Sequence, residues 1–381
     1  MAAALVLTAT PQGARAACRP APAWPAWAAF SAQFISADGR VVDPASPHSH
    51  STSEGQAYAL FFALVAGDRA GFERLLRWTE NNLAAGDLSQ RLPAWQWGRR
   101  DDGRWGVIDA NAAADADLWL LYTLAQAGRL WQAPRYIDIA SRLAERVLQE
   151  ESLRLPGLGR VLLPGPAGFV SRNSDGALTA VKLNPSYWPL PVLRWLASHS
   201  GHPEWAAVFL ASVQLLQTTA PRGLAPDWVR LEAAPPPWRP STAADLSVGS
   251  YDAIRVYLWL GLSAAAEPER NTLLRHYSPM LDRVEAGDGP PEQVQAQVQV
   301  GGRAEGRGPA GFAWALRPMA QALRHAAAGR TLARAVTERP TEPAAYYGQA
   351  LTLFAQGHLE HRYRFESDGA LTPQWHPCNE P

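Results

Sequence analysis

The stretch from residue 114 to residue 150 reads ADADLWLLYTLAQAGRLWQAPRYIDIASRLAERVLQE and shows the clearest helical pattern of the chain. Apolar residues recur three and four positions apart within it, which predicts two helices over 114–128 and 133–150 joined by a short turn. The same pattern predicts further helices along nearly the whole chain, over 24–36, 55–66, 68–84, 186–199, 203–218, 249–264, 267–284, 309–325, 328–338 and 343–356.

These roughly twelve helices pair across short turns, which indicates an all-α fold of helical hairpins. Longer loops separate the pairs, at 37–53, 85–113, 151–185, 219–248 and 285–308. Six hairpins can close into an inner ring of helices within an outer ring, with the long loops and the function at one end. An open solenoid is the alternative, and the lack of a fixed-period repeat counts against it. On the loop face, residues 153–170 predict a small β-hairpin, because short apolar runs alternate with Gly and Pro.

The composition is that of a globular protein, with 381 residues, 47% hydrophobic and 18% charged. Lys and Arg total 35, and Asp and Glu also total 35, so the net charge is zero. Without a basic excess the chain is a poor candidate for binding nucleic acid, whereas a neutral polymer needs no charge steering. The 16 Trp residues serve either as core side chains or as flat faces on which sugar rings stack.

The first 17 residues read as an export signal, with an apolar stretch (AAALVLT) and a small-x-small cleavage site (ARA). No basic residue precedes the apolar stretch, so the true translation start is open. We expect residues 18–381 to form a single domain without a membrane span, in a periplasmic or secreted protein. Cys18 and Cys378 stand near the two ends of that domain and form either one disulfide or two free thiols.

Three acidic sites mark predicted helix starts beside long loops. The first is Glu54, within STSEGQ, where Ser53 can cap the helix and Gln56 can complete a capping box. Glu54 then lies in the first helical turn. An acid there is also explained without any function, because carboxylates complement the positive end of the helix dipole.

The second site holds Asp115 and Asp117, which flank an alanine at the opening of an apolar helix. The third holds Asp252, with Ser250 as a possible cap and Arg255 three residues further on the same helix face. An Arg at this spacing keeps a carboxylate ionised, as a general base requires. Helix capping and a surface ion pair are the alternative explanations of these two sites.

Together the three sites resemble the motifs of glycoside hydrolase family 8, and the resemblance runs from about residue 20 to residue 370. The chain departs from the family signature at Ala114, where Ser or Thr is usual. The matching stretches, in chain order, are Thr52-Ser53-Glu54-Gly55-Gln56, Ala114-Asp115-Ala116-Asp117 with the helix after it up to Leu130-Trp131, Asn184-Pro185-Ser186-Tyr187, Pro226-Asp227-Trp228 and Tyr251-Asp252-Ala253-Ile254-Arg255.

The resemblance implies an (α/α)6 barrel that hydrolyses a β-1,4-glucan with inversion of configuration. It assigns Glu54 as general acid, Asp252 as general base and Asp115 as the residue that grips and distorts the sugar. It places Tyr187 beside the attacking water, and it implies neither a metal nor a cofactor. Within the family, the chain most resembles the periplasmic cellulases that accompany bacterial cellulose synthesis. This resemblance suggests the cellulose synthase machinery as a partner.

Beyond these four residues, we expect aromatic and polar side chains to line a glucan-binding cleft. The candidates are Trp95, Trp97, Trp105, Trp188 and Trp228, at least two of which should contact sugar, together with Asp117 and Arg255. Glu54 poses a difficulty, because a helix N-terminus lowers the pKa of a carboxyl group while a general acid needs a raised pKa. We therefore expect Glu54 to be partly desolvated and close to Asp115.

Other functions remain open at this level. The same chemistry could act on chitosan, xylan or a mixed-linkage glucan, although an uncharged chain is a poor match for cationic chitosan. A non-catalytic glucan-binding subunit of a cellulose export complex is the main alternative, and a protein-binding helical scaffold is another. Neither of these needs a separated pair of acid and base.

Overall fold

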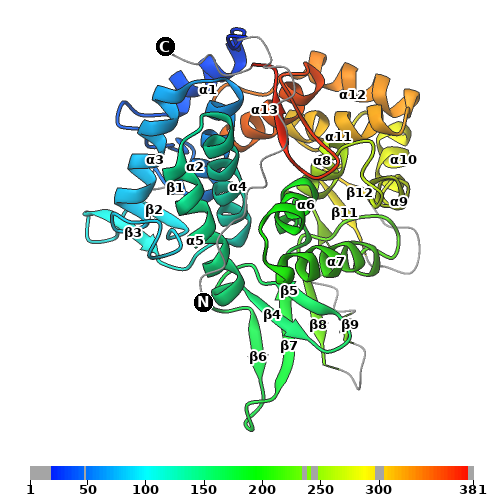
Figure 1. The fold of residues 1–381 in the computed structure, drawn as a ribbon. Coiled ribbons are helices and arrows are strands. Elements are labelled where there is room, and N and C mark those ends of the chain that lie inside the picture. The colour runs from blue at the N-terminus through cyan, green and yellow to red at the C-terminus, as the bar shows by residue number, and fades with distance from the viewer. Residues whose placement is uncertain (1–18, 47–48, 234–237, 242–247, 297–303, 376–381) are drawn as a thin grey trace, which may run out of the picture.

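The computed structural model describes residues 19–46, 49–233, 238–241, 248–296 and 304–375, and helices dominate this part of the chain (Figure 1). The predicted export signal and both cysteines lie outside the described residues. Thirteen α-helices occur among the described residues: α1 (Pro25–Phe34), α2 (Ser53–Val65), α3 (Arg69–Leu83), α4 (Ala114–Leu130), α5 (Pro134–Glu150), α6 (Leu190–His199), α7 (Pro203–Thr218), α8 (Ile254–Leu262), α9 (Arg270–His276), α10 (Pro279–Ala286), α11 (Ala310–Ala322), α12 (Ala326–Glu338) and α13 (Tyr346–Leu359).

Six of these helices form a closed inner ring. In order around the ring, α2 packs on α4, α4 on α6, α6 on α8, α8 on α11, α11 on α13, and α13 returns to α2. Most inner helices are covered from outside by a chain neighbour, as α3 covers α2, α5 covers α4, α7 covers α6 and α12 covers α11, whereas α13 is contacted by α1 from the other end of the chain. The fold is therefore an (α/α)6 barrel, as predicted, and the closed ring excludes an open solenoid.

The two rings differ in how apolar residues are distributed around each helix. In the inner helix α4, every residue from Ala114 to Gly128 is buried, whereas the outer helix α5 buries one face through Tyr136, Leu143, Val147 and their neighbours. A helix that is apolar all round belongs inside a fold, and one with a single apolar stripe belongs on its surface. The composition of each helix thus specifies its ring.

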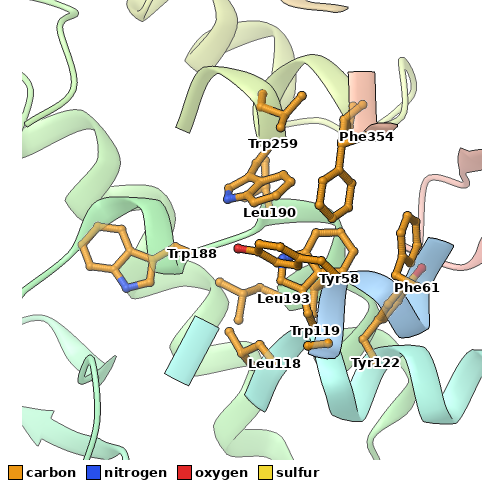
Figure 2. Packing of buried hydrophobic residues seen from close by; sticks show 14 of the residues in the cluster. Tyr58, Phe61, Leu118, Trp119, Tyr122, Trp188, Leu190, Leu193, Trp259 and Phe354 are labelled. Carbon is orange, nitrogen blue, oxygen red and sulfur yellow. The ribbon is translucent and has the colours of Figure 1, made fainter. Parts of the chain in front are cut away.

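Aromatic side chains fill the centre of the barrel (Figure 2). Trp119 of α4 lies at the middle of this cluster, with ring centroids 5.0 Å from both Phe61 and Phe354 and 5.1 Å from Trp259. Ring pairs at such distances, here one edge to face and two tilted, contribute about 0.5–1.5 kcal/mol per pair beyond their burial. The cluster joins four inner helices into one core beneath the site described below.

Three helix predictions were wrong in their boundaries. The segment predicted as one helix over 267–284 is two, α9 and α10, because Pro279 cannot continue a helix and restricts the residue before it. Helix α6 begins at Leu190 rather than at 186, after a short 3-10 turn at Pro185–Tyr187. Helix α8 begins at Ile254 rather than at 249, so Asp252 lies in the turn before the helix.

The long loops carry small antiparallel sheets. The hairpin predicted within 153–170 is confirmed as β4 (Ser152–Leu155) and β5 (Gly159–Leu162), but the other strands were not predicted. These are β1 (Ser51–Thr52), β2 (Gln96–Arg99) and β3 (Trp105–Asp109) in one sheet, β6 (Val170–Arg172), β7 (Leu178–Leu183), β8 (Val229–Glu232) and β9 (Arg239–Pro240) in a second, β10 (Val248–Gly249), β11 (Gln293–Gln295) and β12 (Ala304–Glu305) in a third, and β13 (Tyr363–Phe365) with β14 (Leu371–Pro373). The sheet of β6 to β9 projects from the lower end of the helical body in Figure 1. Of the helices in the described ranges, none has the length and apolar character needed to cross a membrane.

Candidate active site

A buried guanidinium joins two of the predicted carboxylates. Arg255, in the first turn of α8, donates from Nη1 to Asp115 Oδ2 at 3.1 Å and from Nη2 to Asp252 Oδ1 at 2.7 Å. Its side chain is only 6% exposed, so the pair with Asp252 is not the surface ion pair that spacing alone allows. The predicted Arg255–Asp252 contact is confirmed, and the bridge to Asp115 brings the starts of α4 and α8 together.

Neighbouring polar groups fix this guanidinium in place. Arg255 Nη2 also donates to Ser186 Oγ at 2.8 Å, and the Ser186 hydroxyl in turn donates to Asn184 Oδ1 at 2.7 Å. The ring of Tyr187 lies 5.5 Å from the guanidinium carbon, and burial, followed by the charges of Asp115 and Glu54, raises the pKa of its phenol. Tyr187 therefore stays protonated and can donate a hydrogen bond within the site.

Glu54 lies in the first turn of α2, and its Oε2 is buried without a hydrogen-bond partner among the described residues. Burial is the main cause that raises the pKa of Glu54; Arg255 opposes it, and Asp252 adds to it. The expectation of a desolvated Glu54 is confirmed. The expected coupling of Glu54 to Asp115 is supported as well, because burial first and the charge of Glu54 second raise the pKa of Asp115, and repulsion between two carboxylates acts on both.

The predicted capping box at the start of α2 is wrong. Thr52 is the cap, because its Oγ1 accepts the N–H of Gly55 at 3.2 Å, while Ser53 Oγ has no partner among the described residues. Gln56 points away from the helix end into the protein, where its Oε1 accepts the N–H of Val41 at 2.6 Å. The cap thus comes one residue earlier than predicted, and Gln56 serves the packing of a distant loop.

Asp115 and Asp252 differ in their access to solvent. Asp115 is 1% exposed, and its Oδ1 accepts the N–H of Ala116 at 2.9 Å. The side chain of Asp252 is 32% exposed and can be reached by water. Ser250 does not cap this turn as predicted, because its hydroxyl donates to the carbonyl of Glu292. The site therefore combines a buried acid, a buried carboxyl on a guanidinium, and an accessible carboxyl on the same guanidinium.

Asp117 does not line a cleft, contrary to its predicted substrate contact. It is fully buried, as is Glu151 at the end of α5, and none of their four carboxyl oxygens has a hydrogen-bond partner among the described residues. Burial raises the pKa of both groups, followed by the charge of Asp115 for Asp117 and by the charge of Asp117 for Glu151. The two carboxyl groups therefore tend to hold a proton in the folded state.

This pair predicts a pH-dependent stability. The folded state holds a proton that the unfolded chain releases above the ordinary carboxyl pKa, so stability should fall as pH rises from about 4 towards the raised pKa values. Replacing Glu151 by Gln removes one titrating group and leaves a donor for Asp117. The free energy of unfolding is measured in urea between pH 5 and 8 for wild type and variant. In the variant it should fall less steeply with pH, by up to roughly 1.4 kcal/mol per pH unit.

The neighbouring Glu150 supplies a matched control, because it is exposed and pairs with Arg146 on the surface of α5. Glu150→Gln should leave the wild-type slope unchanged. If Glu151→Gln also keeps that slope, the buried Asp117 and Glu151 do not take up a proton on folding.

The predicted tryptophans divide between core and surface. Trp188 is 2% exposed and lies among core side chains (Figure 2), so the prediction that it lines a cleft was wrong. Trp105 is 50% exposed and stacks on Trp97, with centroids 5.4 Å apart and planes at 23°. Trp95 and Trp228 are partly buried.

Two side chains that the sequence did not single out complete these aromatic surfaces. The guanidinium of Arg40 lies 4.4 Å from the ring centroid of Trp97 and 4.8 Å from that of Trp105. The ring of Phe169 lies parallel to Trp228 at 6.1 Å, within 5°. Arg40 and Phe169 lie in loops that are distant in the sequence from their partners, so local sequence patterns could not predict these contacts.

A hollow of about 180 Å³ opens beside the start of α2, next to Glu54. It is lined by Val41, Asp43, Ser46, His50, Ser51, Thr52, Gln96 and Tyr346. The hydroxyl of Tyr346 lies against the first turn of α2, because a Cβ on Gly55 would lie 2.2 Å from it. Most of the residues that line the hollow carry polar groups.

Comparisons with known proteins identify the family and the fold. The family described as Glycosyl hydrolases family 8 matches residues 9–361. An endoglucanase of Escherichia coli is 43% identical over 352 residues, covering 92% of this chain and 91% of its own, and one of Xanthomonas axonopodis pv. citri is 43% identical over 376 residues, covering 98% and 94%. The crystal structure of an endo-1,4-D-glucanase from Vibrio fischeri superposes with a TM-score of 0.80 at 39% identity, covering 93% of this chain and 99% of the other.

Proposed function

Because this chain belongs to glycosyl hydrolase family 8, we propose that Glu54 and Asp252 carry its chemistry, with inversion at the cleaved bond. The chain is an endoglucanase that hydrolyses β-1,4-glucans, as its relatives are named. One observation carries the assignment of roles: Glu54 is buried with a raised pKa, whereas Asp252 is accessible and bound to Arg255. A general acid must hold a proton at working pH, and a base must reach water.

In the proposed reaction, Glu54 protonates the glycosidic oxygen while Asp252 takes a proton from the attacking water. The water attacks the anomeric carbon from the face opposite the leaving group, so the configuration inverts. This geometry needs the two carboxyl groups about 6.5–9.5 Å apart, with the water between Asp252 and the sugar. Asp115, which Arg255 holds, is proposed to bind hydroxyls of the distorted sugar, and Tyr187 is proposed to orient the water.

The partly exposed aromatic residues are proposed to bind sugars on either side of the cleaved bond. Trp97 and Trp105 present a stacked surface, and Trp228 with Phe169 presents another. Flat apolar faces of this kind pack on pyranose rings. Trp95, which is partly buried near β2, is proposed as a further contact.

Two measurements on carboxymethyl cellulose and cellohexaose test this function. Viscosity should fall faster than reducing ends appear, because internal cleavage shortens chains before many ends form. Proton NMR of the first product should show the α-anomer at the new reducing end, which then mutarotates. A first product in the β-anomer would contradict inversion. A protein that binds cellohexaose and releases no product would be the non-catalytic binding subunit.

The cellular setting is proposed on separate grounds. The apolar stretch and small-x-small site within residues 1–17 support export to the periplasm or beyond, where the enzyme would trim glucan chains from the cellulose synthase machinery. Cell fractionation with an antibody against the chain tests the location. Recovery with cytoplasmic markers alone would contradict it.

A further inference from the structure

Helix α8 holds the turn that carries Asp252 only through carbonyl groups, since the N–H groups of Ile254 and Arg255 donate to the carbonyls of Ser250 and Asp252, both at 3.1 Å. The helix begins at Ile254, and the peptide N–H groups of Ser250, Asp252 and Ala253 precede its regular hydrogen bonds. Groups in this position have no partner within a helix and need one from outside. An unsupported turn would let the Asp252 side chain move, although Arg255 holds its Oδ1.

One carboxylate oxygen supplies all three partners. Asp227 Oδ1 accepts the N–H of Ser250 at 2.8 Å, of Asp252 at 3.1 Å and of Ala253 at 2.7 Å. We propose that Asp227 is a positioning residue, which sets the direction from which Asp252 meets the attacking water. This inference rests on the proposed role of Asp252 as general base.

Asp227 can act in this way because its own segment is anchored to the same elements. Its N–H donates to the carbonyl of Val248 in β10 at 2.8 Å, and the N–H of Ala225 donates to the hydroxyl of Tyr257 on α8 at 2.8 Å. The backbones also meet closely, since a Cβ on Gly249 would lie 1.9 Å from the carbonyl oxygen of Ala225. Loop, turn and helix therefore form one rigid unit.

The other contacts of the turn do not replace Asp227. The hydroxyl of Ser250 donates to the carbonyl of Glu292 at 2.7 Å, and the hydroxyl of Tyr347 donates to the carbonyl of Tyr251 at 2.5 Å. Both hold the flanks of the turn, and neither reaches the N–H of Asp252. Loss of Asp227 thus frees the peptide groups next to the base while its carboxylate remains.

The test separates positioning from folding with three variants assayed on cellohexaose. Asp227→Ala removes the acceptor and should lower kcat roughly 100-fold with KM within about twofold, because a misplacement of about 1 Å costs that much. Asp227→Asn keeps an oxygen acceptor and should stay within roughly tenfold of wild-type kcat. Asp68→Ala is the control, since Asp68 is also partly buried and caps α3 through the N–H of Gly71 at 2.8 Å; it should lower the melting temperature and leave kcat unchanged.

Several results would overturn the proposal. These are an Asp227→Ala enzyme with kcat within twofold of wild type, an equal loss of kcat in Asp68→Ala, or a loss that lies entirely in KM. If Asp227→Ala does not fold, Asp227→Glu keeps the charge but displaces the oxygen by one methylene, and unchanged kcat in that variant would refute positioning. Asp252→Asn tests the premise separately. If this variant is fully active, Asp252 is not the general base. If it is inactive while Asp227→Ala is fully active, Asp252 is still the base and only the positioning role of Asp227 is refuted.

Discussion

Replacing Glu54 by Gln should lower kcat on cellohexaose by about 10²–10⁴-fold, the usual contribution of a general acid. The amide has nearly the same shape and cannot deliver a proton to the departing oxygen, so KM should change little. Burial raises the pKa of Glu54, and the acid works only while protonated, so kcat/KM of the wild type should decline as pH rises through that pKa. Steady-state kinetics across pH 4–9 measures both effects.

An aryl cellobioside with a good leaving group provides the decisive control for Glu54. Such a substrate needs little protonation of the departing oxygen, so Glu54→Gln should recover most of the wild-type rate on it. Asp252→Asn should remain inactive on the same substrate, because the water still has to be activated. If Glu54→Gln stays as slow on the activated substrate as on cellohexaose, or if Asp252→Asn is rescued with it, the two roles are assigned wrongly.

The helices were predictable because the buried face of a helix is formed by apolar residues three and four positions apart in the sequence. Helix α4 is mostly apolar and buried on all sides, whereas α5 is buried on one side only, and this difference matches their inner and outer rings. Apart from the β4–β5 hairpin, the small sheets were not predicted, and strands such as β1 have only two residues, too few for an alternating pattern. Helix starts were shifted where prolines or an outside cap intervened.

The site was predictable only in its local parts. Arg255 follows Asp252 by three residues, so their contact is visible in the sequence, whereas Arg255 and Asp115 stand 140 residues apart and meet only through the barrel. The sequence does not distinguish Trp188 from Trp105, since each stands close to a family motif. Only packing separates a side chain that is 2% exposed from one that is 50% exposed.

The largest loss of stability at the site is expected from removal of Arg255. Arg255→Met should lower the free energy of unfolding by about 3–5 kcal/mol, because it leaves two carboxylates, one of them fully buried, without their cation. It should also lower kcat at least 100-fold, since Asp115 and Asp252 lose their shared anchor. Arg255→Lys should restore neither property fully, because an ammonium cannot place two parallel donors on separate carboxylates. Urea unfolding and cellohexaose kinetics measure the two losses.

Arg194 supplies the matched control for Arg255, because it also joins two carboxylates, Glu267 and Glu269, away from the site. Arg194→Met should destabilise the protein and leave kcat of the folded enzyme unchanged. The pH dependence separates the two variants further. Without Arg255 the already raised pKa of Asp115 rises more. The loss of unfolding free energy in Arg255→Met should therefore shrink as pH falls, because this carboxyl then takes up a proton. A deficit in Arg255→Met that grows towards low pH, or a loss of kcat shared equally by Arg194→Met, would show that Arg255 does not hold an ionised carboxyl for catalysis.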